Sequence, residues 1–134
     1  MSQENVERIR QGFADFNRGN FDTVLRELFH PEIELTPGIG ALGIGTIRGR
    51  EAVGRFWRDE LPQALDEFQI EPLEFEDLGE VVLVRNRYRA RGPASGMDID
   101  QTFVTAYWFQ DGLVRRLRDH ATRREALEAA GLSV

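Results

Sequence analysis

Apolar residues in the first half of the chain recur at three- and four-residue spacing, which is the pattern of amphipathic helices. The first stripe, which ends at Gly19, comprises Val6, Ile9, Phe13 and Phe16. A second, shorter helix is predicted to begin after an Asn20 cap and to stop before Pro31. A third begins near Arg50 and is kinked or ended by Pro62; its buried positions are Val53, Phe56, Trp57, Ala64 and Leu65.

From residue 68 onward the pattern has a period of two, which is typical of β-strands. It predicts four successive strands over residues 68–78, 81–91, 99–109 and 113–120. The turns between them are short, so neighbouring strands are expected to be antiparallel. A shorter strand is predicted around Ile33 and Leu35, before a glycine-rich loop over residues 36–49. A capping box from Thr122 to Glu125 opens a final short helix that stops at Gly131.

This order of helices first, then antiparallel strands, then one closing helix predicts an α+β fold. Four long strands under three N-terminal helices are expected to form a curved antiparallel sheet that wraps an apolar cavity. The 134 residues have the length of one domain, and we interpret residues 1–134 in that way.

Two amino acids are absent, and each absence excludes a class of chemistry. Without cysteine the chain has no disulfide, thiol nucleophile or thiolate metal site. All 17 basic residues are arginine, which excludes a Schiff-base lysine and a phosphate-loop lysine. Arginine stays protonated near neutral pH, so it can bind and polarise a substrate but is a poor proton shuttle.

The charge and hydropathy of the chain bear on its partners and location. The net charge is −6, and nucleic acid binding needs a continuous basic surface, so no nucleic acid partner is expected. No apolar run is long enough to span a membrane. The N-terminus lacks the basic start and apolar core of a secretory signal, so the expected location is cytoplasmic.

The segment "PGIGALGIG", residues 37–45, contains the glycine spacing of a dinucleotide-binding loop, Gly38-x-Gly40-x-x-Gly43. A working fingerprint needs a helix directly after the last glycine and then a parallel strand. Here six further loop residues precede Arg50, and antiparallel strands follow the helix. We therefore interpret the segment as a loop whose glycines permit unusual backbone angles, and expect no cofactor.

Asp119 is the strongest candidate for chemistry. Alternation along the last strand puts Leu113, Leu117 and Asp119 on one face, so burial of the leucines points the carboxylate toward the apolar interior. A carboxylate there tends to have a raised pKa and can act as a general acid or base. The alternative is a structural ion pair with an arginine. His30 and His120 are far apart without carboxylates at ligand spacing, so no metal site is expected.

The strand over residues 81–91 has apolar residues on both faces, which leaves its orientation open. Odd positions carry two apolar residues and then four arginines; even positions carry Val82, Val84, Asn86 and Tyr88. If the odd face is inward, Arg85 or Arg87 can orient Asp119 or stabilise an oxyanion. If it is outward, the arginines form a solvated or subunit-contact row and Tyr88 enters the pocket. The candidate substrate-binding residues are Phe16, Trp57, Tyr88, Gln101 and Tyr107.

Three stretches carry a resemblance to a known family: "FADFNRGNFDTVLRELFHPEIEL", "IRGREAVGRFW" and "FQDGLVRRLRDHATRREALEAAGL". With them the whole chain resembles a SnoaL-like member of the nuclear-transport-factor-two-like superfamily. The resemblance implies a cone of curved antiparallel sheet closed by helices, an apolar cavity, and commonly a homodimer made through the outer face of the sheet. It places the glycine-rich loop at the open mouth of the cone, where a flap can close over an apolar ligand.

The superfamily hosts several activities on one fold, so its site residues must be compared one by one. Ketosteroid isomerases use a tyrosine in the first helix, a base after the first strand and an acid on the third long strand. Gly12, Thr36 and Thr105 stand at those positions here, and none can do the same work. The resemblance therefore does not favour steroid isomerisation.

Two other activities use an aspartate on the last strand. Limonene epoxide hydrolases combine it with an Arg-x-Asp pair; Arg118-Asp119 matches the first element, but Arg85-x-Arg87 lacks the second carboxylate. Polyketide cyclases of the SnoaL type use the last-strand aspartate as general acid/base in an aldol closure, and Asp119 fits that position.

These observations predict a cofactor-free protein that acts on a small apolar or polyketide-like molecule, with Asp119 as the proton-transfer group. The alternative is a non-catalytic ligand-binding or dimerisation module in which Asp119 forms a structural ion pair. If the protein is a cyclase, isomerase or hydrolase, we expect a cavity of roughly 300 Å³ or more with Asp119 in its wall. The module predicts a filled core with Asp119 paired to arginine.

Overall fold

A computed structural model describes residues 2–38, 45–92 and 98–132. The helices are α1 (Ser2–Asn17), α2 (Phe21–Glu27), a third helix in three consecutive parts, and α5 (Arg123–Ala129). The parts of the third helix are α3 (Arg50–Arg55), η2 (Phe56–Glu60) and α4 (Leu61–Ala64). No helix among these described segments is both long and apolar enough to cross a membrane.

Six strands form one sheet in the order β2-β1-β6-β5-β4-β3. Their bounds are β1 (Phe29–Thr36), β2 (Ile47–Arg48), β3 (Asp66–Asp77), β4 (Val81–Arg91), β5 (Asp98–Gln110) and β6 (Leu113–His120). The four long strands are antiparallel neighbours, as predicted. The sheet is nevertheless mixed, because β1 pairs with β6 in parallel. A parallel pair needs a long connection, and here the third helix and four strands, β2 to β5, lie between the two partners.

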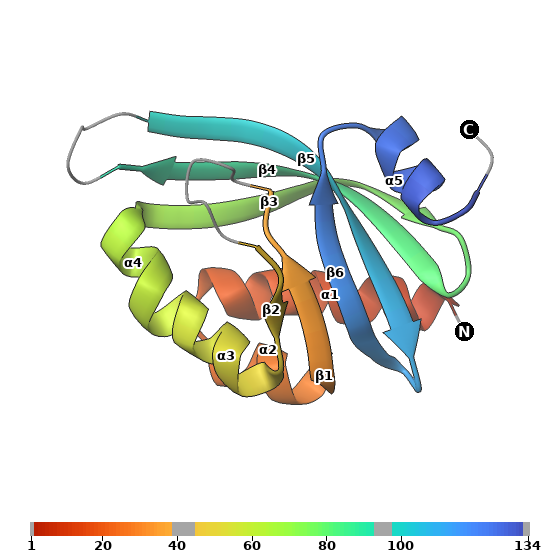
Figure 1. Cartoon of the computed structure of the whole chain (residues 1–134), viewed down its shortest axis with the longest axis horizontal. Coiled ribbons are helices and arrows are strands. Elements are labelled where there is room, and N and C mark those ends of the chain that lie inside the picture. Colours follow the sequence, from red (N-terminus) through yellow and green to blue (C-terminus); the bar gives the residue numbers. More distant parts are fainter. Residues whose placement is uncertain (1, 39–44, 93–97, 133–134) are drawn as a thin grey trace.

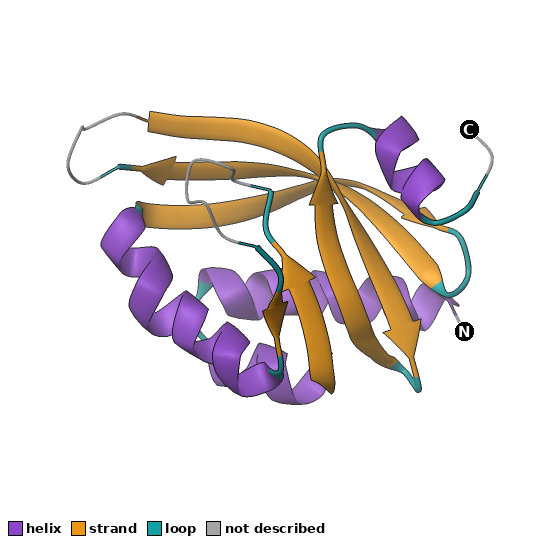
Figure 2. Ribbon diagram, viewed as in Figure 1, coloured by secondary structure: helices purple, strands orange, loops and turns teal. Residues whose placement is uncertain are grey.

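The predicted α+β fold is confirmed: the sheet is curved and open, and helices α1 to α4 lie within its curve (Figure 1). Helix α5 lies apart from the other helices, against β5 and β6 (Figure 2). Each face of the sheet therefore has its own apolar cluster. The inner cluster joins α1 to α4 with the sheet. The outer cluster comprises Val81, Leu83, Val104, Ala106, Ala126 and Leu127.

The apolar stripe of α1 faces the inner surface of the sheet. Ile9, Phe13 and Phe16 are all less than a tenth exposed, as the helical spacing predicts. Asn17 then holds the end of the helix to β3: its amide nitrogen donates to the Ile70 carbonyl oxygen at 2.8 Å, and the Ile70 N–H donates to its side-chain oxygen at 3.1 Å. This contact fixes where α1 crosses the sheet.

Strand β1 begins earlier than the apolar pattern predicts. The second helix ends at Glu27, and His30 and Pro31 lie in the strand instead of terminating the helix. The pairing of β1 with β6 shifts between Phe29 and Glu34, so Pro31 lies in an irregular stretch where its missing N–H is tolerated. The His30 side chain bonds within the strand, since its Nδ1 accepts a hydrogen bond from the Glu32 N–H at 3.0 Å.

The third helix continues past Pro62 because the turn before it widens. Residues 56–60 form a π-helical turn, in which the Leu61 N–H donates to the Phe56 carbonyl oxygen five residues earlier. Proline has no N–H and its ring crowds the preceding turn, and the wider turn accommodates both. The helix therefore ends at Ala64 instead of at the proline.

Strand β2 lies in the segment predicted to be loop, where it pairs with β1 as an antiparallel edge. The flap predicted from "PGIGALGIG" falls on residues 39–44, and most of the predicted turn 92–96 falls on residues 93–97. Both ranges lie outside the described residues.

Candidate functional site

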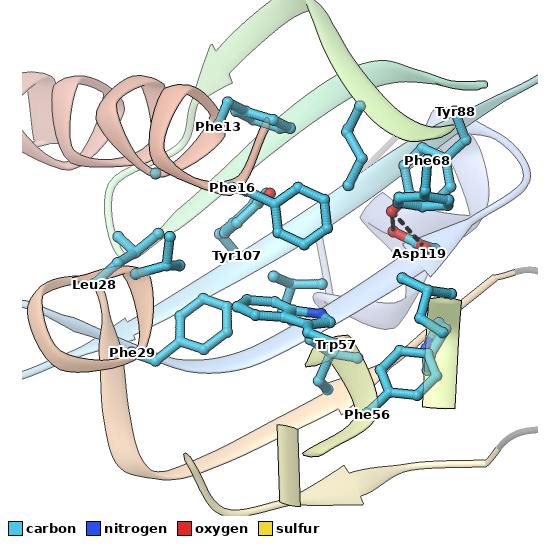
Figure 3. A pocket seen from close by; sticks show the side chains of 17 residues that line it. Phe13, Phe16, Leu28, Phe29, Phe56, Trp57, Phe68, Tyr88, Tyr107 and Asp119 are labelled. Carbon is cyan, nitrogen blue, oxygen red and sulfur yellow. Dashed lines mark hydrogen bonds between the residues drawn. The ribbon is translucent and has the colours of Figure 1, made fainter. Parts of the chain in front are cut away.

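A pocket lies between the inner face of the sheet and helices α1, α2 and α3–α4 (Figure 3). Asp119 is the one charged side chain among the described residues that line it. About half of the lining residues are aromatic: Phe13, Phe16, Phe29, Phe56, Trp57, Phe68, Tyr88 and Tyr107. The pocket is therefore an apolar space with one carboxylate in its wall.

The volume of the pocket is about 80 Å³, well below the cavity of roughly 300 Å³ expected for catalysis. The aromatic rings occupy the space themselves. The ring of Trp57 packs at centroid distances of 5.0 Å from Phe16 and 5.4 Å from Phe29. The interior is thus neither a wide cavity nor a core in which Asp119 is paired to arginine.

The residue Asp119 is 9% exposed, and its carboxylate accepts hydrogen bonds from three groups. The Tyr88 hydroxyl lies 2.8 Å from Oδ1 and 2.7 Å from Oδ2, and Figure 3 shows the two side chains meeting at one end of the pocket. The Thr105 hydroxyl donates to Oδ1 at 2.5 Å, and the Gly38 N–H donates to Oδ2 at 2.9 Å. The prediction that Asp119 points inward is confirmed.

Burial and hydrogen bonding act on the Asp119 pKa in opposite directions. Burial raises the pKa and is the larger effect; the donors Thr105, Tyr88 and Gly38, and the charge of His120, lower it. Burial, followed by the charge of Asp119, raises the pKa of Tyr88 well above its usual value. Tyr88 therefore stays protonated, and the carboxyl holds its proton to a higher pH than an exposed aspartate.

Arg85 and Arg87 lie on the outer face of the sheet, the second of the two orientations that the sequence left open, so neither reaches Asp119 and their candidacy as catalytic residues is wrong. The Arg85 Nε lies 3.3 Å from Glu74 Oε2, and Arg87 forms a two-pronged pair with Asp100 at 2.8 Å and 2.6 Å. The even-numbered face of β4 points inward because Val82, Val84 and Tyr88 pack in the large inner cluster. The odd apolar pair, Val81 and Leu83, is buried instead under α5.

Four of the five predicted substrate-binding residues line the pocket: Phe16, Trp57, Tyr88 and Tyr107. Gln101 is the exception, since its side chain is exposed. It pairs with Tyr88 across the strands, but the next residue on its face, Phe103, packs against the Tyr88 ring at a centroid distance of 4.9 Å. This aromatic pair stands between Gln101 and Asp119.

Three residues of the site were not anticipated as part of it: Gly38, Asn86 and Thr105. The Asn86 amide nitrogen donates to the Thr105 hydroxyl oxygen at 2.9 Å, so it extends the network around Asp119. Asn86 and Thr105 are each 1% exposed. The available signal was a polar residue within an apolar face: Asn86 on the even-numbered face of β4 and Thr105 on the odd-numbered face of β5. This signal indicates a site only once the inward face of β4 is known.

Gly38 is the first glycine of the dinucleotide-like spacing, and its role is steric. A Cβ on Gly38 would lie 2.7 Å from the Asp119 Cβ and 2.8 Å from a Phe103 ring carbon. Only a residue without a side chain lets the backbone N–H reach the carboxylate.

The described residues include no group of three or more histidine, aspartate or glutamate side chains placed to hold a metal ion. The candidate site consists of the Asp119 carboxylate, the Tyr88 and Thr105 hydroxyls, the Gly38 N–H, the Asn86 amide and an aromatic wall.

Comparison with solved structures finds the same fold repeatedly. An NTF2-like protein of unknown function from Burkholderia pseudomallei K96243 is 27% identical, with a TM-score of 0.77, over 92% of this chain and 95% of that one. TerC, co-crystallised with polyporic acid, is 26% identical, with a TM-score of 0.75, over 92% and 95%. An LEH-like epoxide hydrolase from M. tuberculosis, 15% identical with a TM-score of 0.71 over 95% and 89%, shares the fold alone.

Comparison with curated protein sequences finds no match. Residues 9–117 match the family described as the SnoaL-like domain, a stretch that ends two residues before Asp119. The chain belongs to the SnoaL-like domain family.

Proposed function

We propose that the protein transfers a proton to or from a small apolar molecule bound in the pocket, and that Asp119 exchanges this proton without a cofactor. The observation that carries the proposal is a buried carboxylate, without an arginine partner among the described residues, in the wall of an aromatic pocket. Ring closure of a polyketide-like chain, isomerisation and epoxide hydrolysis all require such a proton transfer.

The surroundings of Asp119 suit acid–base chemistry. Burial raises the pKa of the carboxyl, and a base with a higher pKa takes a proton more readily. The hydroxyls of Tyr88 and Thr105 limit this rise by stabilising the ionised form. Phe16, Trp57 and Tyr107 shape the pocket and exclude water from the reacting atoms.

Binding in this pocket requires the aromatic rings to move apart, because about 80 Å³ holds only a few atoms. Ligand pockets usually measure about 300–1,000 Å³. The proposal therefore includes an opening of the wall around Phe16 and Trp57 when the ligand enters. A liganded crystal structure is expected to show a larger pocket with the Asp119 network intact.

The small volume favours a second candidate, a non-catalytic ligand-binding or dimerisation module. In that case Asp119 has a structural role. Its partners would be the hydroxyls and the Gly38 N–H instead of the arginine expected from the sequence.

Replacing the carboxylate tests the catalytic role. The first probe is polyporic acid, with which TerC was co-crystallised, and a panel of small epoxides, cyclic ketones and poly-β-ketones follows. Binding is measured by calorimetry and turnover by chromatography of the products. Asp119→Asn is expected to keep affinity within a few-fold and to lower turnover by at least about 100-fold. Where Asp119 acts as the base, wild-type turnover is expected to rise as the pH rises through its elevated pKa.

Asp100→Asn is the matched control, because Asp100 is an exposed carboxylate paired with Arg87 on the outer face. It is expected to leave turnover unchanged. Equal turnover in wild type and Asp119→Asn would rule out the catalytic role. Tight binding with no turnover of any probe would support the module.

A further inference from the structure

We propose that Asn86 is a positioning residue that acts through Thr105, holding the Thr105 hydroxyl as a hydrogen-bond donor to Asp119. The inference rests on the proposed role of Asp119 as the proton-exchanging group. It follows from a chain of hydrogen bonds across three strands. The Asn86 amide donates to the Val84 carbonyl and to the Thr105 hydroxyl, and the Thr105 hydroxyl donates to the Asp119 carboxylate.

The Val84 carbonyl determines which way the Asn86 amide faces. Asn86 Nδ2 lies 3.0 Å from the Val84 carbonyl oxygen, which can only accept a hydrogen bond. The opposite orientation would bring two acceptor oxygens together. The amide nitrogen therefore stays on this side, where it also lies 2.9 Å from the Thr105 hydroxyl oxygen.

The amide in turn determines the direction of the Thr105 hydroxyl. An amide nitrogen only donates, so the Thr105 oxygen accepts from Asn86. The single hydroxyl hydrogen is then directed to the side of Asp119 and Tyr88, where Asp119 Oδ1 accepts it at 2.5 Å and the Tyr88 hydroxyl is a second neighbour of Thr105. A donor aimed at the carboxylate favours its ionised form.

Asn86 is kept in the core despite an unsatisfied atom. The residue is 1% exposed, and its Oδ1 has no hydrogen-bond partner among the described residues. A buried acceptor without a partner is unfavourable, and an apolar residue of similar size would avoid this loss. The two hydrogen bonds donated by Nδ2 are what an apolar residue at this position cannot supply.

The hydrogen-bond partners of Asp119 differ in whether they can change from donor to acceptor. The Gly38 N–H can only donate, and Thr105 is held as a donor by Asn86. Tyr88 has a hydroxyl that can turn from donor to acceptor when Asp119 takes up a proton. The other ionisable group lining the pocket is Tyr107 on β5, while His120 follows Asp119 on β6; the described helices α1–α4 contribute none to the lining.

The test is a carbon-13 NMR titration of the aspartate carboxyl groups, with the Asp119 signal assigned by Asp119→Asn. Asn86→Leu and Thr105→Val are each expected to raise the Asp119 midpoint by about one pH unit, because each removes support for the ionised form. The double variant is expected to titrate like Thr105→Val alone, since Asn86 acts through Thr105. Should Asn86→Leu not fold, Asn86→Ser replaces it, because a serine hydroxyl has one hydrogen and cannot make both donations.

Val82→Ala is the matched control, since Val82 is a fully buried residue on the same face of β4. It loses packing but is expected to leave the Asp119 midpoint unchanged. A wild-type midpoint in Asn86→Leu would overturn the inference, and so would shifts that add in the double variant. The titration needs no substrate, so its outcome is separate from the turnover of Asp119→Asn.

Discussion

Gly38 joins the start of the glycine-rich loop to the carboxylate of the site. Its N–H donates to Asp119 Oδ2 at 2.9 Å, and the Asp119 Cβ and the Phe103 ring leave no room for a side chain. The glycine that looked like part of a phosphate-binding loop is therefore required by close packing. The contact therefore ties the backbone at Gly38 to the Asp119 side chain.

Gly38→Ala is expected to destabilise the protein by about 1–3 kcal/mol, because the new methyl group overlaps two buried neighbours. It is also expected to raise the Asp119 pKa, since the N–H moves away from Oδ2. Urea denaturation and the carboxyl titration measure the two effects. Gly45→Ala is the control in the same loop: nothing lies within 4 Å of its Cβ position, so a change within about 0.5 kcal/mol is expected. Equal stability of the two variants would contradict the steric role.

At the scale of elements, the third helix and α5 each help to position residues of the site. The π-helical turn at Phe56–Glu60 lets the helix continue past Pro62 and presents Phe56, Trp57 and Leu61 to the pocket. Helix α5 buries Ala126 and Leu127 over the outer face of β4 and β5. By covering Val81 and Leu83, α5 supports the orientation of β4 that turns Tyr88 and Asn86 inward.

The cap of α5 offers a test of this support. The Thr122 hydroxyl accepts from the Glu125 N–H at 3.1 Å, and Glu125 accepts from the Ala121 N–H at 3.2 Å. Thr122→Ala is expected to lower the free energy of unfolding by about 1 kcal/mol, the usual effect of losing an N-cap. Denaturant titration measures it, with Arg124→Ala, an exposed change in the same turn, as the control. A loss no larger than that of the control would show that the cap is unimportant.

At the scale of the whole molecule, the outer face of the sheet beyond α5 is covered with charge. Arginines of β4 pair with acids of both neighbouring strands: Arg85 with Glu74, Arg87 with Asp100, and Arg91 with Asp98. Each pair is exposed and contributes little to stability by itself. As a patterned surface, however, the rows of opposite charge can match a second copy of the same face.

We expect the protein to form a homodimer through this outer face, as the resemblance to the superfamily implies. Sedimentation velocity is expected to give twice the chain mass of 15.3 kDa. Arg87→Glu puts like charges beside each other at Asp100 and is expected to shift the mass toward the monomer. Arg18→Glu, an exposed change just after α1, is the control. A monomer at every concentration would exclude the dimer.

Local patterns in the sequence predicted most of the elements. The bounds predicted for residues 81–91 and 113–120 agree with β4 and β6, because two-residue alternation and short turns mark such strands clearly. The inward direction of Asp119 followed from Leu117, but the placement of Leu113 on the same buried face was wrong, because the pairing of β6 with β5 shifts and Val114 enters the inner cluster instead. The α5 capping box was also predicted, since each of these signals lies within a few residues of the chain. The parallel pairing of β1 with β6 was not, because no local pattern reports on a pair so far apart in sequence.

The sequence by itself determined that the chain is an α+β fold with a carboxylate directed at an apolar interior. Only the tertiary structure decided how β4 faces, because both of its faces carry apolar residues and two separate clusters compete for them. That choice sends the arginines outward and brings Tyr88 and Asn86 toward Asp119. The network then joins Gly38, Thr105 and Asp119, which lie far apart in the chain. Periodicity shows which residues share a face of one strand. A hydrogen bond between strands depends on which of these faces the fold brings together.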